Sequence, residues 1–347
     1  MSAPTVPVRG PLDRPAGEPA APPKVRGRIL PPPVTGPEVV LIGAVIVLWA
    51  ILYFTTPAFL DPGSLRALLV ATAPVALMGV GMTIIIISGG IDVSVGGAVM
   101  VCSAITAKVM VNSGISLPLA ILVAVAVGAV LGFVNGLLIA YGRVHAIIIT
   151  FGTANLFQWL GLQVFGSSTI NHIPTTLAVF GRGPAGRVFG IPYAFLVTVV
   201  VAAFAWWYLR YTPGGRHFYA IGGDPSAARL AGVRVQRRVL MAYVITGVLV
   251  GLGSCFVIAQ GTATLDQSVG SGQELGVIAA VVIGGTSIMG GRGSVLGTVL
   301  GALLVQTVSS GVTQLGWSSD LSNLFVGVFI IVAVGADLLR QRTRRTV

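Results

Sequence analysis

The sequence contains few charged residues. Only 9% of its 347 residues are charged, whereas a soluble domain carries about 25% charged residues. This inventory cannot make a water-facing surface, so an arrangement of several soluble domains is excluded. Cysteine is also scarce: Cys102 and Cys255 both lie inside apolar stretches and are interpreted as small hydrophobic residues, with no indication of a disulfide or a metal site.

Apolar and small residues make up most of the sequence. The sequence is 54% hydrophobic and contains 47 glycines, which let helices approach one another closely in lipid. A membrane-spanning helix needs about 20 mostly apolar residues. Ten segments meet this requirement: 39–56, 65–88, 94–111, 117–141, 146–165, 191–209, 239–260, 274–289, 295–315 and 322–339. They predict an all-α, polytopic membrane protein with about ten transmembrane helices.

The formal net charge is +11, and many of the basic residues that produce it lie beside apolar runs. Basic residues cluster in the N-terminal segment, between residues 210 and 238, and at the C-terminus. A nucleic-acid-binding protein would spread them over a folded soluble face, whereas this placement follows the positive-inside rule of membrane proteins. Both termini and the 210–238 loop are therefore predicted to be cytoplasmic. The predicted outer connections hold Asp61, Asp266, Glu274 and Asp320.

The same patterns predict the domain organisation. Residues 1–38 are rich in proline and polar residues and cannot bury enough apolar surface to offset the entropy of ordering, so a disordered cytoplasmic tail is expected. Residues 39–339 form the transmembrane domain, and residues 340–347 form a short basic cytoplasmic tail.

The stretch 88–97 interrupts the second apolar run. Gly89 and Gly90 favour the end of one helix, and Asp92 or Ser94 favours the start of the next. Two interpretations remain open: a tight turn at the inner edge, or a broken helix deeper in the membrane, whose backbone must then line a cavity. Asp92 is either a functional acid within the membrane or a helix cap.

Polar residues in this break and in the predicted spans are candidates for lining a solute path. They are Ser88, Asp92, Ser94, Asn135, Asn155 and Gln158. Each amide side chain has the alternative of bonding across helices. The three histidines lie far apart, and the sequence shows neither a Ser-His-Asp arrangement nor paired carboxylates, so we expect no catalytic residue, metal or cofactor.

The 210–238 loop contains the pattern of a short helix. Asp224 suits the N-cap, Pro225 the first turn, and Gly232 the stop. A helix of about two turns is not stable alone in water, so we expect it to dock on a partner. The sequence lacks a GxxxxGK[ST] phosphate loop, so it is not itself an ATPase. The alternative is a basic loop that only sets membrane topology.

Three blocks carry a resemblance to a known family: GMTIIIISGGIDVSVGG (81–97), TPGGRHFYAIGGDPSAARLAGV (212–233) and ELGVIAAVVIGGTSIMGGRGSVLGTVLGA (274–302). Their order and spacing resemble those of the membrane permeases of ribose-, xylose- and galactose-type sugar ATP-binding-cassette importers, over residues 40 to 340. One departure is His145-Ala146, where the family usually has a proline.

The resemblance implies an importer permease in the bacterial inner membrane. Its partners would be separate ATPase subunits, a periplasmic or lipid-anchored sugar-binding protein, a second permease copy or a paralogue, and membrane lipids. It also implies a helix that couples the permease to the ATPase, formed by Asp224, Pro225, Ala228, Arg229, Leu230 and Gly232. The alternative function is an ion- or proton-coupled secondary transporter, which requires buried titratable groups.

Glycines hint at an internal repeat. Shifted by 195 residues, Gly81, Gly89, Gly90 and Gly96 fall on Gly276, Gly284, Gly285 and Gly291. Many transporters contain such repeats, but in a sequence this rich in glycine the four matches leave the question undecided.

Overall fold

The computed structural model describes residues 36–345 except 57, 167, 182–185 and 262, with side chains described up to residue 335. Most of the predicted N-terminal tail and the side chains of the predicted C-terminal tail lie outside the described residues. The first helix begins at Gly36, so residues 36–38 are helical and do not belong to a disordered tail.

Eight described helices are long and apolar enough to cross a membrane. They are α1 (Gly36–Thr55), α2 (Pro62–Ile87), α3 (Val95–Ser113), α4 (Leu117–Gly142), α5 (Ala146–Phe165), α6 (Tyr193–Tyr211), α9 (Val235–Gln260) and α11 (Val295–Gln314). The other helices are α7 (Pro213–Gly223), α8 (Pro225–Leu230), α10 (Gln273–Ile283) and α12 (Asp320–Arg345). A 3-10 helix, η1 (Thr175–Phe180), and a hairpin of β1 (Arg187–Val188) and β2 (Ile191–Pro192) lie between α5 and α6.

The prediction of an all-α polytopic membrane protein is confirmed, and each of the ten predicted segments contains a helix. The eighth segment, predicted as a span over 274–289, is wrong in extent because α10 ends at Ile283. Gly285 has a φ of +87°, and its amide donates to the carbonyl of Val282, which closes the helix. At about 1.5 Å per residue, the 11 residues of α10 reach only about half-way across a bilayer.

The helix α2 is the centre of the packing. In its most apolar window 94% of the residues are buried, compared with 22% in α1 and in α5. The partly exposed helices present large apolar side chains outward, such as Phe54 and Val200. This distribution is that of helices whose outer faces meet lipid and whose inner faces surround one buried helix.

Glycine lets α4 and α9 pack with their backbones in contact. A Cβ added at Gly247 would collide with the carbonyl oxygen of Gly128, and one added at Gly132 would collide with that of Tyr243. Gly128 and Gly132 are four residues apart, as are Gly247 and Gly251, which is the small-residue spacing of closely packed membrane helices. Part of the glycine content therefore serves this one interface.

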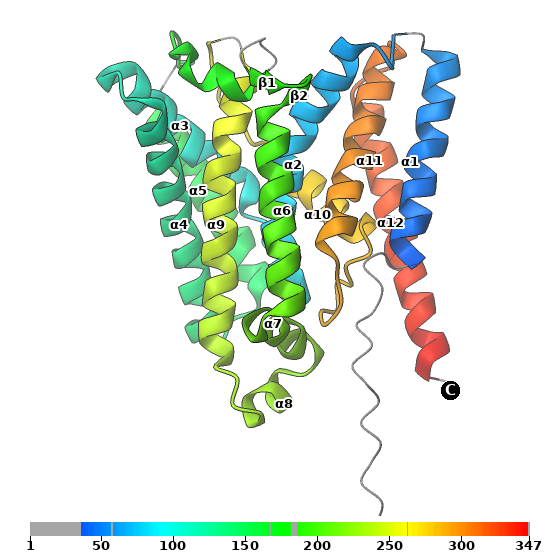
Figure 1. Ribbon diagram of the computed structural model, residues 1–347. Coiled ribbons are helices and arrows are strands. Elements are labelled where there is room, and N and C mark those ends of the chain that lie inside the picture. The colour runs from blue at the N-terminus through cyan, green and yellow to red at the C-terminus, as the bar shows by residue number, and fades with distance from the viewer. Residues whose placement is uncertain (1–35, 57, 167, 182–185, 262, 346–347) are drawn as a thin grey trace, which may run out of the picture. The chain divides into compact units, whose positions relative to one another are not determined.

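The ends of the helices separate the connections into two groups. Figure 1 shows α7, α8 and the C-terminal end of α12 at one end of the helices, and β1 and β2 at the other. The start of α1 lies at the same end as α7. The hydroxyl of Ser294 donates to the carboxylate of Glu38 in α1, and the neighbouring Gly293 is bonded by Tyr219 of α7. The basic 210–238 loop and the basic C-terminal end thus share one side, as the charge pattern predicts.

We expect Gly247→Ala to destabilise the protein by about 1–3 kcal/mol, because the added methyl group forces two backbones apart. The measurement is thermal unfolding of the purified protein in detergent. Gly43→Ala in α1 is the matched control, since a Cβ there meets no heavy atom within 4 Å. Equal stabilities of the two variants would show that the α4–α9 contact is not as tight as described.

Candidate functional site

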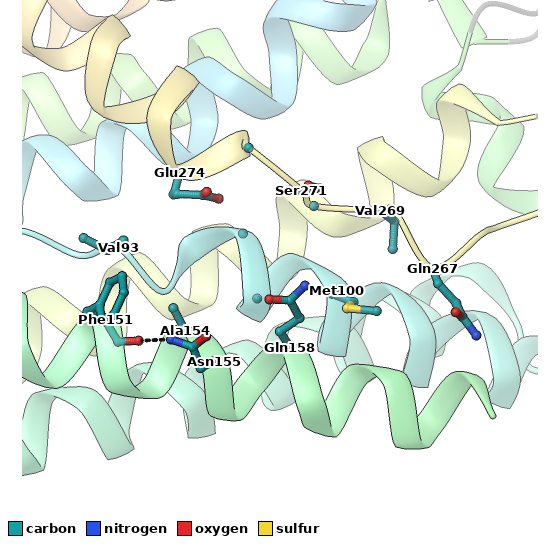
Figure 2. Close-up of a pocket in the computed structure, with 14 residues that line it drawn as sticks. Val93, Met100, Phe151, Ala154, Asn155, Gln158, Gln267, Val269, Ser271 and Glu274 are labelled. Atoms are coloured by element: carbon teal, nitrogen blue, oxygen red, sulfur yellow. Dashed lines mark hydrogen bonds between the residues drawn. The ribbon is translucent and has the colours of Figure 1, made fainter. Parts of the chain in front are cut away.

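A polar cleft lies beside the exposed face of α5. The start of α3, the middle of α5 and the segment before α10 surround it (Figure 2). Its polar side chains come from α5, from the segment before α10 and from the first turn of α10, and they are Asn155, Gln158, Gln267, Ser271 and Glu274. The cleft measures about 200 Å³, less than the roughly 300–1,000 Å³ of pockets that enclose a small molecule. It is a shallow recess on one subunit, not a closed binding site.

The placement of Glu274 corrects the sequence prediction, which assigned this acid to an outer connection. Leu265 pairs with Ile170 of the α5–α6 connection, and the chain then turns inward, so that Gly270 packs against Gly96 at the start of α3. A Cβ at Gly96 would overlap the Glu274 carboxylate. Glu274 therefore begins α10 inside the helical region, on the wall of the cleft.

The break between α2 and α3 is partly buried against α5 and α9. The hydroxyl of Ser88 donates to the carbonyl of Ile85 (2.8 Å) at the end of α2. The carbonyl of Ile91 accepts from the hydroxyls of Thr150 (3.2 Å) and Tyr243 (3.3 Å), which belong to α5 and α9. Side chains of two neighbouring helices thus bond to a carbonyl of the non-helical stretch, as a membrane protein requires of backbone outside its helices.

Asp92 organises the start of α3. It is 5% exposed, and its Oδ1 accepts from the amide (2.9 Å) and the hydroxyl (2.6 Å) of Ser94. Asn135 of α4 in turn donates to the Ser94 hydroxyl (2.7 Å). The Ser94 side chain itself makes no capping bond. These contacts favour the structural interpretation of Asp92, because its carboxylate orders the chain that leads into the helix.

The six sequence candidates therefore divide into two groups. Ser88, Asp92, Ser94 and Asn135 are buried in the protein interior, and none of them lines the cleft. Asn155 and Gln158 do line it, one turn apart on the exposed face of α5. Sequence reasoning missed Glu274, Gln267 and Ser271, because hydropathy alone does not show that a polar segment turns back between helices.

The end of α2 and the loop between α10 and α11 meet at α7. The amide of Gly291 donates to the carbonyl of Ile87 (2.8 Å). A Cβ at Gly222 of α7 would collide with the carbonyl of Ile87 and approach the amide of Gly291. The hydroxyl of Tyr219 donates to the carbonyl of Gly293 (3.1 Å). Burial raises the pKa of Tyr219 to about 12, with a smaller opposing effect of Arg210, so the phenol keeps its proton for this bond.

The helices α2 and α10 end with the same hydrogen-bond pattern. The amides of Gly89 and Gly90 donate to the carbonyls of Ile86 and Ile85, and those of Gly285 and Thr286 donate to Val282 and Val281. The equivalent residues are 196 apart, so the shift of 195 suggested by the glycines is wrong by one residue. The likeness described is that of a helix-ending motif, and it leaves the question of a repeat undecided.

The helix α8 forms as its sequence predicts. Oδ1 of Asp224 accepts from the amides of Ser226 (2.8 Å) and Ala227 (3.1 Å), and Gly232 ends the turn with a φ of +83°. Ala228 packs with Ile221 and Val233 in a small apolar cluster. On the opposite face Leu230 is 91% exposed, beside the exposed Arg229. Both side chains therefore point away from the apolar cluster that holds α8 to the rest of the chain.

Fold and site together define a polytopic helical membrane protein with a polar recess at its flank and a capped helix at one end. Residues 64–334 match the model of the branched-chain amino acid transport system / permease component family, and the chain belongs to this family. It is a multi-pass protein of the bacterial inner membrane and the permease subunit of an importer. This confirms the sequence prediction over the alternative of a secondary transporter.

Several curated proteins are similar over most of their length. The ribose import permease protein RbsC of Escherichia coli is 35% identical over 86% of this chain and 92% of its own. The fructose import permease protein FrcC of Rhizobium meliloti is 31% identical over 88% and 85%. The autoinducer 2 import system permease protein LsrC of Enterobacter sp. is 35% identical over 87% of each chain. No solved structure matches the chain.

We expect Gly222→Ala to abolish uptake and to lower the thermal stability of the purified protein, because the methyl group would separate α7 from the end of α2 and from the loop between α10 and α11. Gly223→Ala is the control, since its Cβ meets no atom within 4 Å and alanine favours the helix. If the Gly222 variant has the uptake and the thermal stability of the wild type, the close contact described at Gly222 is wrong.

Proposed function

We propose that this chain forms the transmembrane pathway of an ATP-binding-cassette importer for a monosaccharide or a similar small polar solute, which a binding protein delivers. The observation that carries this proposal is the composition of the cleft. Its amide, hydroxyl and carboxylate groups suit a neutral ligand with many hydroxyl groups. Two of the relatives are named for the import of ribose and fructose, which supports a sugar as the solute.

The cleft needs a second permease to enclose it. It opens beside side chains of α5 that no part of the described chain covers, among them Phe151 (64% exposed) and Trp159 (55% exposed). We propose that a second copy or a paralogue packs against this face, so that the pathway runs between two recesses. A shallow recess in each subunit fits a permease that leaves tight binding to the delivering protein.

Force would enter through α8. We propose that its exposed face, with Arg229 and Leu230, docks on a separate ATPase subunit, while Asp224, Pro225, Ala228 and Gly232 shape the helix. Topology alone explains an excess of arginine in this loop, but not a capped helix with an exposed leucine. The helix α7 immediately precedes α8 in the chain, and its Gly222 contacts the end of α2 and the loop between α10 and α11. Closure of the ATPase subunits would thus move these two segments and open the pathway inward.

The double variant Asn155→Leu/Gln158→Leu tests the pathway. We expect uptake of labelled ribose or fructose by the reconstituted importer to fall roughly 10- to 30-fold, since each lost hydrogen bond is worth about 1 kcal/mol, with the ATPase rate unchanged. Asn323→Leu, an exposed amide on α12 outside the cleft, is the control. Unchanged uptake in the double variant would remove this cleft from the pathway. Uphill uptake by the chain alone in vesicles would contradict the importer.

Arg229→Glu tests the coupling. Because Arg229 is exposed and no hydrogen bond within the chain is described for it, we expect normal folding and membrane insertion, together with a loss of uptake of at least tenfold. The ATPase activity should persist without being stimulated by the binding protein. Arg216→Glu on α7 makes the same change of charge on the same side of the protein. If the loop only sets membrane topology, the two variants should show the same uptake.

A further inference from the structure

A second recess lies between α7 and the start of α9, where the proposed transport mechanism has no role for it. It measures about 340 Å³ and is lined by His217, Gly232, Arg234, Arg237, Arg238 and Met241. Three guanidinium groups and an imidazole from two helices therefore converge on one hollow, and its lining contains no acid. A basic loop that only sets topology has no need of such a concave arrangement.

The recess lies at the level where α6 carries its aromatic side chains. Trp206, Trp207, Tyr208 and Tyr211 lie in the last turns of this helix, and Arg210 lies over the rings of Trp206 (5.6 Å) and Tyr211 (5.7 Å). Such belts mark the boundary between headgroups and acyl chains. Nη1 of Arg238 donates to the hydroxyl of Tyr208 (3.3 Å), so the basic recess adjoins this boundary.

The lining of the recess also continues toward the apolar part of α9. Met241, one turn beyond Arg237, is an exposed apolar residue of that helix. The ligand that fits has a negative headgroup that accepts several hydrogen bonds and an apolar portion that lies along the helix. The guanidinium groups offer forked donors to phosphate oxygens, and Nδ1 of His217 is buried without a hydrogen-bond partner.

An acidic surface of the ATPase subunit is the competing occupant. It would have to reach the basic residues that accompany α8, yet Arg229 of that helix lines a different recess together with Arg143. The docking residues Arg229 and Leu230 do not line the basic recess, which shares only Gly232 with the coupling helix. The aromatic belt and the exposed methionine favour lipid.

We propose that His217, Arg234, Arg237 and Arg238 bind the phosphate headgroup of an anionic phospholipid of the inner leaflet. The site depends on the membrane location of the protein and not on the identity of the transported solute. An annular lipid held at the start of α9 would also be in contact with α7, the helix that contacts the end of α2.

The test uses the full chain, purified in detergent and exposed to equal amounts of phosphatidylglycerol and phosphatidylcholine, with bound lipid counted by native mass spectrometry. We expect the wild-type chain to retain phosphatidylglycerol selectively. In Arg234→Gln/Arg237→Gln the affinity should fall roughly 10- to 30-fold, since each arginine near a lipid surface contributes about fivefold. Both residues are exposed, so the fold should survive. The control, Arg143→Gln/Arg216→Gln, removes the same charge from exposed positions outside the recess and should retain the lipid.

Equal losses in the two double variants would overturn the proposal, because they would indicate diffuse attraction by net charge. If millimolar inorganic phosphate displaces phosphatidylglycerol, the recess is a site for a free anion and the lipid proposal is wrong. Displacement by the ATPase subunit alone would assign the recess to docking. A photoreactive phosphatidylglycerol provides an independent measurement: an adduct between residues 217 and 241 supports the site, and adducts elsewhere contradict it.

Discussion

Peptide groups inside a bilayer obtain no hydrogen bonds from the solvent, so every non-helical residue at that depth needs a partner within the protein. The stretches 88–94 and 284–294 are the places where this constraint is most demanding. The chain meets it with the hydroxyls of Thr150 and Tyr243 at one break and with Tyr219 and a direct bond from Gly291 to Ile87 at the other. These bonds attach α5, α7 and α9 to the two non-helical stretches.

Glycine makes this arrangement possible in two different ways. In α4 and α9 it removes side chains so that two helices touch along their backbones. At Gly89 and Gly285 it adopts a positive φ, which ends a helix while its last carbonyls still find donors. At Gly96 it does neither, but leaves room for a carboxylate on the wall of the recess. A chain in which alanine replaced these glycines could contain the same helices but could not assemble them in this way.

The sequence predicted the helices well because a run of about 20 apolar residues has few other uses. The cap of α8 was predictable too, since Asp-Pro at a helix start acts through neighbouring atoms only. The inward path of residues 266–272 was not, because Asp266, Gln267 and Ser271 have the composition of a surface loop. For a related reason, the sequence could not tell which of the solute-path candidates line the recess. In an almost uniformly apolar sequence, nothing distinguishes Asn135, which faces α3, from Asn155, which faces outward.

The contact at Gly222 has a mechanical consequence. Its backbone touches the peptide groups at the end of α2 and in the loop between α10 and α11, and no side chain lies between them. A shift of α7 would therefore press directly on both segments, without first closing a gap. Because the amide of Gly291 also bonds to the carbonyl of Ile87, the two segments are joined to each other, and a movement at the cytosolic surface would reach them together.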